Sequence, residues 1–333
     1  MKIASLASII FLCLQTSGFA GALNVYSYRQ PELLAPIVKV FEREFGHRVN
    51  LLFAKKGLVE RAILEGENTA ADVILTTSVA ELERAKAAGI LMSAGENLQD
   101  IVAGVGDPDG VWVPLSLRPR IFYVSKRLTA RGSMVFDDLL KPEFVGRFCT
   151  RPLKHAYNLS WLAGMIDRRG RVEVENFLQQ LKNQLARTPQ GNDRAQVQAI
   201  YENICDISIG NAYYYGAMLN SKKQKPWAEA VSLVFAKDMN GGVHVDISGI
   251  GVLKASSKKN IAQEFIQFLL SAQAQKIYAQ TNHEFPVVDG VENPAIFEGI
   301  PAWTASESSL ENIANLVPDA ARLVDEVGFD IGR

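Results

Sequence analysis

Tyrosines are the residues of this chain whose type and position favour a specific chemistry. Tyr213 and Tyr214 lie in the run Asn-Ala-Tyr-Tyr-Tyr-Gly, in the first turn of an expected helix that directly follows an expected strand. In an α/β sheet this location is the crevice at the carboxyl ends of the strands, where ligands bind. Tyr157 lies just before another expected helix, and Tyr28 closes the first expected strand. The four phenols therefore lie at element ends, where several loops converge on one cleft.

Phenol oxygens gathered in a cleft suit a hard trivalent cation. The charge of such a cation lowers the pKa of nearby phenols, so tyrosines that are neutral without the metal ionise when it binds. Fe(III) takes about six hard ligands, whereas thiolates and thioethers suit copper(I) or zinc. Four phenolates leave room for water or a small anion, which Arg118 can hold through two parallel hydrogen bonds. The alternative for the tyrosine run is aromatic packing at a domain interface.

Motifs of common enzyme classes do not occur in the sequence. The phosphate loop GxxxxGK[ST], the nucleophile motif GxSxG and the zinc motif HExxH are absent, and no dinucleotide-binding GxGxxG follows the first expected strand. The run Asp107-Pro-Asp-Gly starts like a calcium loop, but Arg118 stands at its twelfth position, where a carboxylate is needed. The four histidines are scattered, so we expect them at surface or core positions. We expect no enzymatic activity.

Composition excludes further classes of protein. The chain has 333 residues, of which 48% are hydrophobic, and a net charge of -1, which argues against a polybasic nucleic-acid binder and an acidic disordered tail. Its length predicts about two domains. Residues 1–22 combine Lys2, an apolar stretch from Ile3 to Leu14 and a final Ala-Gly-Ala, which is the pattern of a secretory signal peptide. We therefore expect a soluble, periplasmic protein that starts near Leu23.

Two cysteines, Cys149 and Cys205, remain in the expected mature chain. An exported protein folds in an oxidising compartment, so this pair is a candidate disulfide. The alternative is two separate buried thiols. A thiolate metal site is not expected, because the sequence contains no CxxC spacing.

Strand and helix signals alternate along the chain. The first part predicts strand 23–27, a helix that ends at Gly46, strand 49–53, helix 58–65, strand 72–76 and a helix opened by Ser78 and Glu81 as a capping box. This order favours a parallel sheet. Later strands are expected at 121–125, 147–150 and 205–209, and later helices from 158, over 172–186, 194–203 and 261–270, and after Asn211. The sequence contains no linker between the two expected domains. We therefore expect that strands near 115–122 and 242–247 cross from one domain to the other.

Several of these segments together resemble the periplasmic ferric-iron-binding proteins of bacterial ABC transporters. The resemblance covers residues 23 to about 288, and its most specific element is the pair of adjacent tyrosines after the Gly210-Asn211 turn. The other matching segments are Asn24–Arg29, Ala71–Thr76, Leu117–Ile121, Cys149–Arg151, Tyr157–Ser160 and Gly191–Arg194.

The resemblance implies the α/β, two-lobed periplasmic-binding-protein fold of type II. Each lobe would be a sheet flanked by helices, and two crossing strands would form the hinge. Lobe 1 would contain residues 23–117 and 244–295, and lobe 2 residues 118–243 and 296–333. The ligand would bind in the cleft between the lobes and close it. The implied partner is an inner-membrane ABC permease, and we expect a monomer that binds no nucleic acid.

The resemblance also implies the residues of an iron site. Tyr213 and Tyr214 match the paired iron tyrosines of the family, and Tyr157 matches a further iron tyrosine of one subgroup. Arg118 matches the arginine that holds a synergistic anion such as carbonate.

Two positions of the chain depart from the family pattern. Where many members have a histidine or His-Tyr past the first strand, this chain has Gln30 and Pro31, and Thr77 stands where some members have a glutamate. We therefore infer that Tyr28 replaces the missing ligand of the first loop.

The expected function is capture of Fe(III) in the periplasm and its delivery to the permease. The alternative is a binding protein of the same fold for a small organic anion such as a phosphonate or sulfonate. In that case the tyrosines donate hydrogen bonds and Arg118 clamps the anion. A visible absorption spectrum distinguishes the two functions, because charge transfer from phenolate to Fe(III) absorbs visible light and an organic-anion complex does not.

Overall fold

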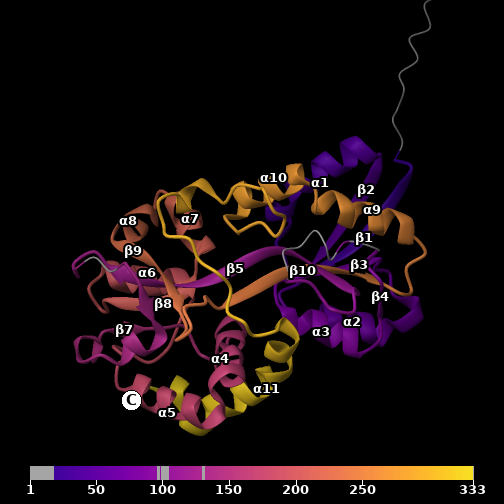
Figure 1. Cartoon of the computed structure of the whole chain (residues 1–333). Coiled ribbons are helices and arrows are strands. Elements are labelled where there is room, and N and C mark those ends of the chain that lie inside the picture. Colours follow the sequence, from indigo (N-terminus) through magenta and orange to yellow (C-terminus); the bar gives the residue numbers. More distant parts are fainter. Residues whose placement is uncertain (1–18, 96–97, 99–104, 130–131, 333) are drawn as a thin grey trace, which may run out of the picture.

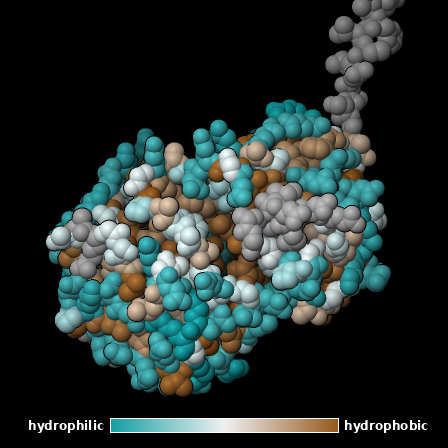
Figure 2. Space-filling view, in the orientation of Figure 1, coloured by the Kyte–Doolittle hydropathy of each residue, from teal (hydrophilic) through white to brown (hydrophobic). Residues whose placement is uncertain are grey.

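The computed structural model describes residues 19–95, 98, 105–129 and 132–332, which form two α/β lobes joined side by side (Figure 1). Residues 1–18, which hold most of the expected signal peptide, lie outside the described part. The face shown in Figure 2 is mainly hydrophilic, and some of its hydrophobic surface lies between the lobes. No helix in the described ranges is long and apolar enough to span a membrane.

Lobe 1 starts with the predicted alternation of strands and helices. Strand β1 (Gly21–Ser27) pairs in parallel with β2 (His47–Phe53) on one side and with β3 (Val73–Thr76) on the other. The strands alternate with helices α1 (Pro31–Phe45), α2 (Leu58–Glu65) and α3 (Val79–Ala87). Helix α1 ends at Gly46, whose φ of 69° is left-handed, a conformation that glycine adopts without strain. The parallel arrangement is therefore as expected.

The predicted capping box at the start of α3 is wrong. Ser78 precedes the helix, but its side chain makes no capping hydrogen bond. Glu81, which would complete the box, instead accepts a hydrogen bond from the Tyr28 hydroxyl at 3.2 Å. A partner distant in the sequence has replaced the local one.

One long strand connects the two lobes. Strand β5 (Trp112–Ser125) pairs with β10 (Val245–Leu253) up to Pro119, and from Arg120 onwards it pairs with β8 (Ile207–Asn211). Strand β9 (Val231–Lys237) lies along the other edge of this second half. The change of partner falls inside the segment 115–122 in which we expected a crossing. The sheet therefore runs without a break through both lobes, in the order β2-β1-β3-β10-β5-β8-β7.

The remaining short strands and the helices α4 to α10 are divided between the two lobes. The short strands are β4 (Leu91–Met92), β6 (Met134–Val135) and β7 (Phe148–Cys149). Lobe 2 has helices α4 (Ala156–Arg169), α5 (Arg171–Lys182), α6 (Asp193–Tyr201), α7 (Tyr213–Leu219) and α8 (Lys225–Glu229), and the chain returns to lobe 1 for α9 (Lys259–Leu269) and α10 (Ala272–Asn282). Three of the expected helices in lobe 2 correspond to α4, α5 and α6.

Helix α11 (Leu310–Val327), which the sequence analysis did not include, contacts both lobes. It packs along α4 and also against α3, and in Figure 1 it lies below the region where the lobes meet. One hydrophobic cluster accordingly contains Leu82 of α3, Leu162 of α4 and Leu323 of α11. The lobes therefore share buried apolar surface beneath the opening between them.

Cys149 and Cys205 form a disulfide with a Cα–Cα distance of 5.9 Å. Cys149 ends β7 and Cys205 lies just before β8, and both side chains are fully buried. The bond joins the end of β7, from which the segment toward α4 continues, to the residues just before β8, the strand that leads to α7. It therefore stabilises the part of lobe 2 that carries Tyr157 and Tyr213.

Removing this disulfide is expected to destabilise the protein measurably. The bond closes a loop of 56 residues, for which the chain-entropy relation gives about 4 kcal/mol of unfolding free energy. We expect the double variant Cys149→Ala/Cys205→Ala to unfold at a clearly lower urea concentration than the wild type. Two free thiols in the wild type, detected by mass analysis under non-reducing conditions, would contradict the bond itself.

Candidate metal centre

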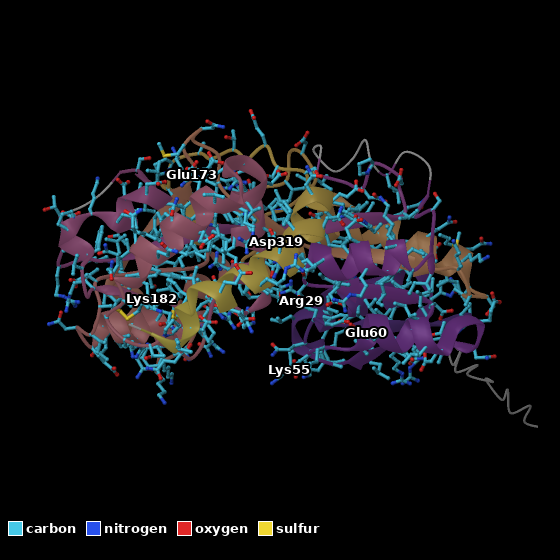
Figure 3. All side chains as sticks on the ribbon, turned by 90° about the horizontal axis from the view of Figure 1, so that it is seen from below. Arg29, Lys55, Glu60, Glu173, Lys182 and Asp319 are labelled. Carbon is cyan, nitrogen blue, oxygen red and sulfur yellow. A yellow bond between two sulfur atoms is a disulfide. The ribbon has the colours of Figure 1, made fainter. Side chains whose placement is uncertain are left out.

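A cavity of about 900 Å³ lies between the two lobes. Lobe 1 contributes Tyr28, Thr77 and Glu81 to its wall, and lobe 2 contributes Tyr157 together with Tyr213 and Tyr214. In Figure 3, which views the molecule from below, Arg29 and Lys55 lie on the lobe 1 side of the opening. The four tyrosines predicted from the sequence therefore line one cavity.

Three of these tyrosines gather on the lobe 2 wall. The hydroxyl of Tyr213 donates a hydrogen bond to the hydroxyl of Tyr157 at 3.2 Å, and the ring centroids of Tyr213 and Tyr214 are 4.3 Å apart. Tyr157 is the second residue of α4, and the other two open α7. Two helix starts that are far apart in the sequence thus place their phenols together. The third tyrosine of the run, Tyr215, packs instead against the core of lobe 2.

The start of α7 differs from the sequence prediction. Asn211 was expected to open this helix, but it is the last residue of β8, and the capping position is taken by Ala212. The side-chain oxygen of Asn211 accepts a hydrogen bond from the guanidinium of Arg120 at 2.9 Å. The buried arginine therefore uses the group that would otherwise have capped the helix.

Without metal, the phenols of Tyr213 and Tyr214 stay protonated at neutral pH. Burial raises the pKa of Tyr213 well above its usual value near 10, and the neighbouring Tyr157 and Tyr214 phenols raise it further. Burial and the neighbouring Tyr157 likewise raise the pKa of Tyr214. Taking protons from these groups at neutral pH requires a strong positive charge in the cavity.

Arginines lie against the faces of the clustered rings. The guanidinium carbons of Arg118 and Arg151 are 5.1 and 5.3 Å from the centroid of the Tyr157 ring, and that of Arg194 is 5.9 Å from the centroid of Tyr214. Positive charge at these distances favours the phenolate over the phenol. Among the described residues of the cavity wall, Glu81 is the one acidic side chain, whereas Arg151 and Arg194 also line it. The cavity is therefore electropositive.

Arg118, predicted to hold an anion, is buried behind the Tyr157 ring and is not among the residues that line the cavity. One terminal nitrogen donates to the carbonyl oxygens of Thr77 and, at 2.7 Å, Ile247. The same nitrogen lies 3.3 Å from the carboxylate of Asp246. Arg118 therefore has several partners within the protein, and its contact with an anion stays a prediction.

Tyr28 lines the cavity, but its hydroxyl has other partners. It accepts hydrogen bonds at 3.0 Å from the backbone N–H groups of Leu58 and Val59, at the start of α2, and donates one to Glu81. Burial raises the pKa of Tyr28 to about 12. One donated and two accepted hydrogen bonds use the full capacity of a phenol. Tyr28 as a metal ligand therefore stays a prediction from the sequence, and the structure gives it a capping role.

Two histidines that the sequence analysis set aside line the cavity. His155 precedes α4 and its Nδ1 accepts a hydrogen bond from the backbone N–H of Tyr157 at 3.3 Å. Burial, assisted by the charge of Arg151, lowers the pKa of His155 to about 4. His283 lies at the end of α10, and its Nε2 is 3.1 Å from the side-chain nitrogen of Asn220. His283 is far from the tyrosines in the sequence, whereas His155 lies two residues before Tyr157, and that proximity was a signal for it.

Within the described residues, no group of three or more histidine, cysteine, aspartate or glutamate side chains is arranged to hold a metal ion. The tyrosine cluster offers a different set of donors, the phenol oxygens of Tyr157, Tyr213 and Tyr214. Such a set of hard phenol oxygens fits a hard cation.

The variant Tyr28→Phe tests the two roles of Tyr28. Because the hydroxyl caps the start of α2, we expect the variant to lose about 1 kcal/mol of unfolding free energy. We also expect it to keep any visible band that the wild type shows with added ferric citrate. A band that collapses in this variant would instead identify Tyr28 as a ligand.

Comparisons with known proteins agree with this fold. Residues 68–307 match the family model described as bacterial extracellular solute-binding protein. Iron uptake protein A2 of Synechocystis is 32% identical over 95% of this chain and 92% of its own.

The crystal structure of Mannheimia haemolytica ferric iron-binding protein A in an open conformation is 42% identical, with a TM-score of 0.87, over 93% of this chain and 99% of its own. A Trichodesmium protein in complex with iron and citrate ligands has a TM-score of 0.86 and 32% identity, over 93% of this chain and 100% of its own. The predicted two-lobed α/β fold is thereby confirmed, and the chain belongs to the bacterial extracellular solute-binding protein family.

Proposed function

We propose that this protein captures Fe(III) as its cargo, with Tyr157, Tyr213 and Tyr214 as ligands in the cleft between the lobes. The observation that carries the proposal is the contact between the hydroxyls of Tyr157 and Tyr213, 3.2 Å apart and on different helices. A small cation bound octahedrally at about 2.0–2.1 Å from each oxygen separates neighbouring ligand oxygens by about 2.9 Å. The two hydroxyls thus lie close to the spacing of adjacent ligands before any metal arrives.

The surroundings of the phenols support a cation of high charge. Because burial keeps Tyr213 and Tyr214 protonated, only a strongly polarising ion makes them phenolates at neutral pH. The relatives are named for ferric iron and iron uptake. These names do not favour the organic-anion alternative for this chain.

Three phenolates leave positions on an octahedral ion unfilled. We propose that a synergistic anion such as carbonate fills some of them, attracted by the cationic side chains of the cavity wall. Arg151 and Arg194 are the nearest of these to the tyrosine rings. The charge of Arg118 supports the same site from behind Tyr157.

Capture requires the lobes to close on the ion, and we propose that they do so about the segment near residue 119, where β5 changes partner. We keep the expected division into lobe 1 (23–117 and 244–295) and lobe 2 (118–243 and 296–333). In support of the last range, Asp319 and Asp325 of α11 form ion pairs with Arg171 and Lys154 of lobe 2.

We further propose that the protein acts as a periplasmic monomer, exported by its signal peptide, that passes iron to an inner-membrane ABC permease without chemical change to a substrate. The names of relatives, such as the Fe(3+)-binding periplasmic protein of Serratia marcescens, support the compartment. Strand β1 already includes Gly21 and Ala22. A mature chain that starts at Leu23 would therefore lack the first two residues of that strand.

A visible absorption spectrum of the purified protein with added ferric citrate tests the iron site. We expect a phenolate-to-Fe(III) charge-transfer band in the wild type, its collapse in Tyr214→Phe, and its retention in the control Tyr215→Phe, because Tyr215 packs into the core. A wild type that stays colourless at saturating iron would refute the proposal and favour the organic anion.

Iron binding is also expected to release protons and to weaken in acid. Tyr213 and Tyr214 have raised pKa values in the metal-free protein, so each must lose a proton to coordinate. Each proton released makes the affinity fall about ten-fold for every pH unit of acidification. We expect Tyr213→Phe to release one proton fewer than the wild type when ferric citrate is added in weak buffer with a pH indicator. Affinity that is independent of pH would contradict phenolate coordination.

A further inference from the structure

Arg120 lies fully buried on β5 between the two segments that carry the clustered tyrosines. One terminal nitrogen donates to the side-chain oxygen of Asn211 at 2.9 Å, and the other donates to the side-chain oxygen of Asn158. Asn158 directly follows Tyr157, and Asn211 lies two residues before Tyr213. A single guanidinium therefore connects the start of α4 with the end of β8.

Each asparagine in turn fixes its own segment. The side-chain nitrogen of Asn158 donates to the carbonyl oxygens of Arg151 and Pro152, both at 3.2 Å, and so holds the turn that leads into α4. The backbone carbonyl of Asn211 accepts a hydrogen bond from the Tyr123 hydroxyl at 2.8 Å. Movement of Arg120 would therefore displace both backbone segments.

A buried aspartate supports the same arrangement. Asp193, fully buried at the start of α6, lies 3.8 Å from Arg120, forms an ion pair with Arg151 and accepts a hydrogen bond from the backbone N–H of Asn211 at 3.3 Å. Burying a guanidinium is costly unless it is paired and hydrogen-bonded, and its planar fork spans two acceptors with a geometry that lysine does not reproduce. Unlike Arg151, Arg120 does not line the cavity.

We propose that Arg120 is a positioning residue for the tyrosine cluster: by bridging Asn158 and Asn211 it sets the spacing of the Tyr157 and Tyr213 hydroxyls. The consequence for iron rests on the proposed function. Arg120 touches neither the cargo nor the phenols, and acts through the two asparagines. Its loss separates the two hydroxyls beyond hydrogen-bonding distance and weakens iron binding.

The test compares Arg120→Lys, which keeps the charge, with Arg120→Met, which keeps only the bulk. A control is Arg168→Met, because Arg168 is a partly buried arginine of lobe 2 that pairs with Asp238 and Ser308 rather than with the segments of the tyrosines. For the folded fraction of each protein, the affinity for iron added as ferric citrate and the visible band are measured. We expect both Arg120 variants to bind iron about 10- to 100-fold more weakly with a shifted band, and the control to match the wild type.

Two results of these measurements would overturn the proposal. A lysine variant with wild-type band and affinity would mean that only the charge of Arg120 matters. Arg120 variants that unfold more easily but keep the wild-type band and affinity would mean that its role is only structural.

Asn158→Ala keeps the proposal testable if the arginine variants do not fold. This substitution removes one end of the bridge and leaves Arg120 paired with Asn211 and Asp193. We expect it to weaken iron binding in the same way. Where Arg120→Lys does fold, adding Asn158→Ala to it should cause little further loss, because both act through one connection. Fully additive losses would contradict a shared bridge.

A metal-free measurement separates this proposal from the proposed function. In crystals of metal-free Arg120→Lys we expect the hydroxyls of Tyr157 and Tyr213 to lie more than about 3.5 Å apart, beyond hydrogen-bonding distance. An unchanged distance would overturn the positioning role even if the wild type binds iron. An increased distance would support it even if the wild type shows no band, in which case only the iron function would fail.

Discussion

The change of partner within β5 is the constraint on which the site depends. Up to Pro119 the strand pairs with β10, and from Arg120 it pairs with β8. Arg118 and Arg120 lie two residues apart and so on the same face of the strand. The first binds the Thr77 and Ile247 carbonyls, and the second binds Asn158 and Asn211. Strand β5 thus carries one buried arginine on each side of Pro119, the point about which we propose that the lobes move.

The electrostatics of the cavity follow from those buried charges. Phenols in a buried setting resist ionisation, and the arginines around them do not remove that resistance, because the pKa values of Tyr213 and Tyr214 stay raised. The arginines instead reduce the repulsion that several adjacent phenolates would otherwise experience. In the proposed site, Tyr213 and Tyr214 therefore remain protonated when no cation is bound and lose their protons together when one binds. Occupancy of the site then depends on the charge of the ion.

Sequence reasoning identified the cluster where residue type and position along an element sufficed. Tyr157, Tyr213 and Tyr214 were found because they stand at helix starts, and the parallel start of the sheet followed from the alternation of strands and helices. The reasoning failed where a distant partner replaced a local one. Glu81 bonds to Tyr28 rather than closing a capping box, and Asn211 serves Arg120 rather than its own helix.

Other features were missed although the sequence carries part of their signal, as the Ser309 cap and the apolar periodicity of α11 show. His155 and His283 line the cavity from separate lobes; His155 lies beside Tyr157 in the sequence, whereas only the fold brings His283 to the cavity. Arg151 and Asp193 stood in segments that carried the family resemblance, so a signal for them existed, but their pairing required the fold. Helix α11 contains Pro318, which removes a helical hydrogen bond, and packing on α3 and α4 compensates for that loss.

The position of α11 in the chain has a consequence for the order of assembly. A chain that is exported from its N-terminus brings the segments of Tyr157 and Tyr213 across the membrane well before residues 310–327. Until α11 arrives, the apolar surfaces of α3 and α4 that it covers stay exposed. The two lobes then lack the buried surface that they share through this helix. Under the proposed export, the cleft is complete only after residues 310–327 have crossed, and a chain held back before that point has its tyrosines outside but not yet a finished binding protein.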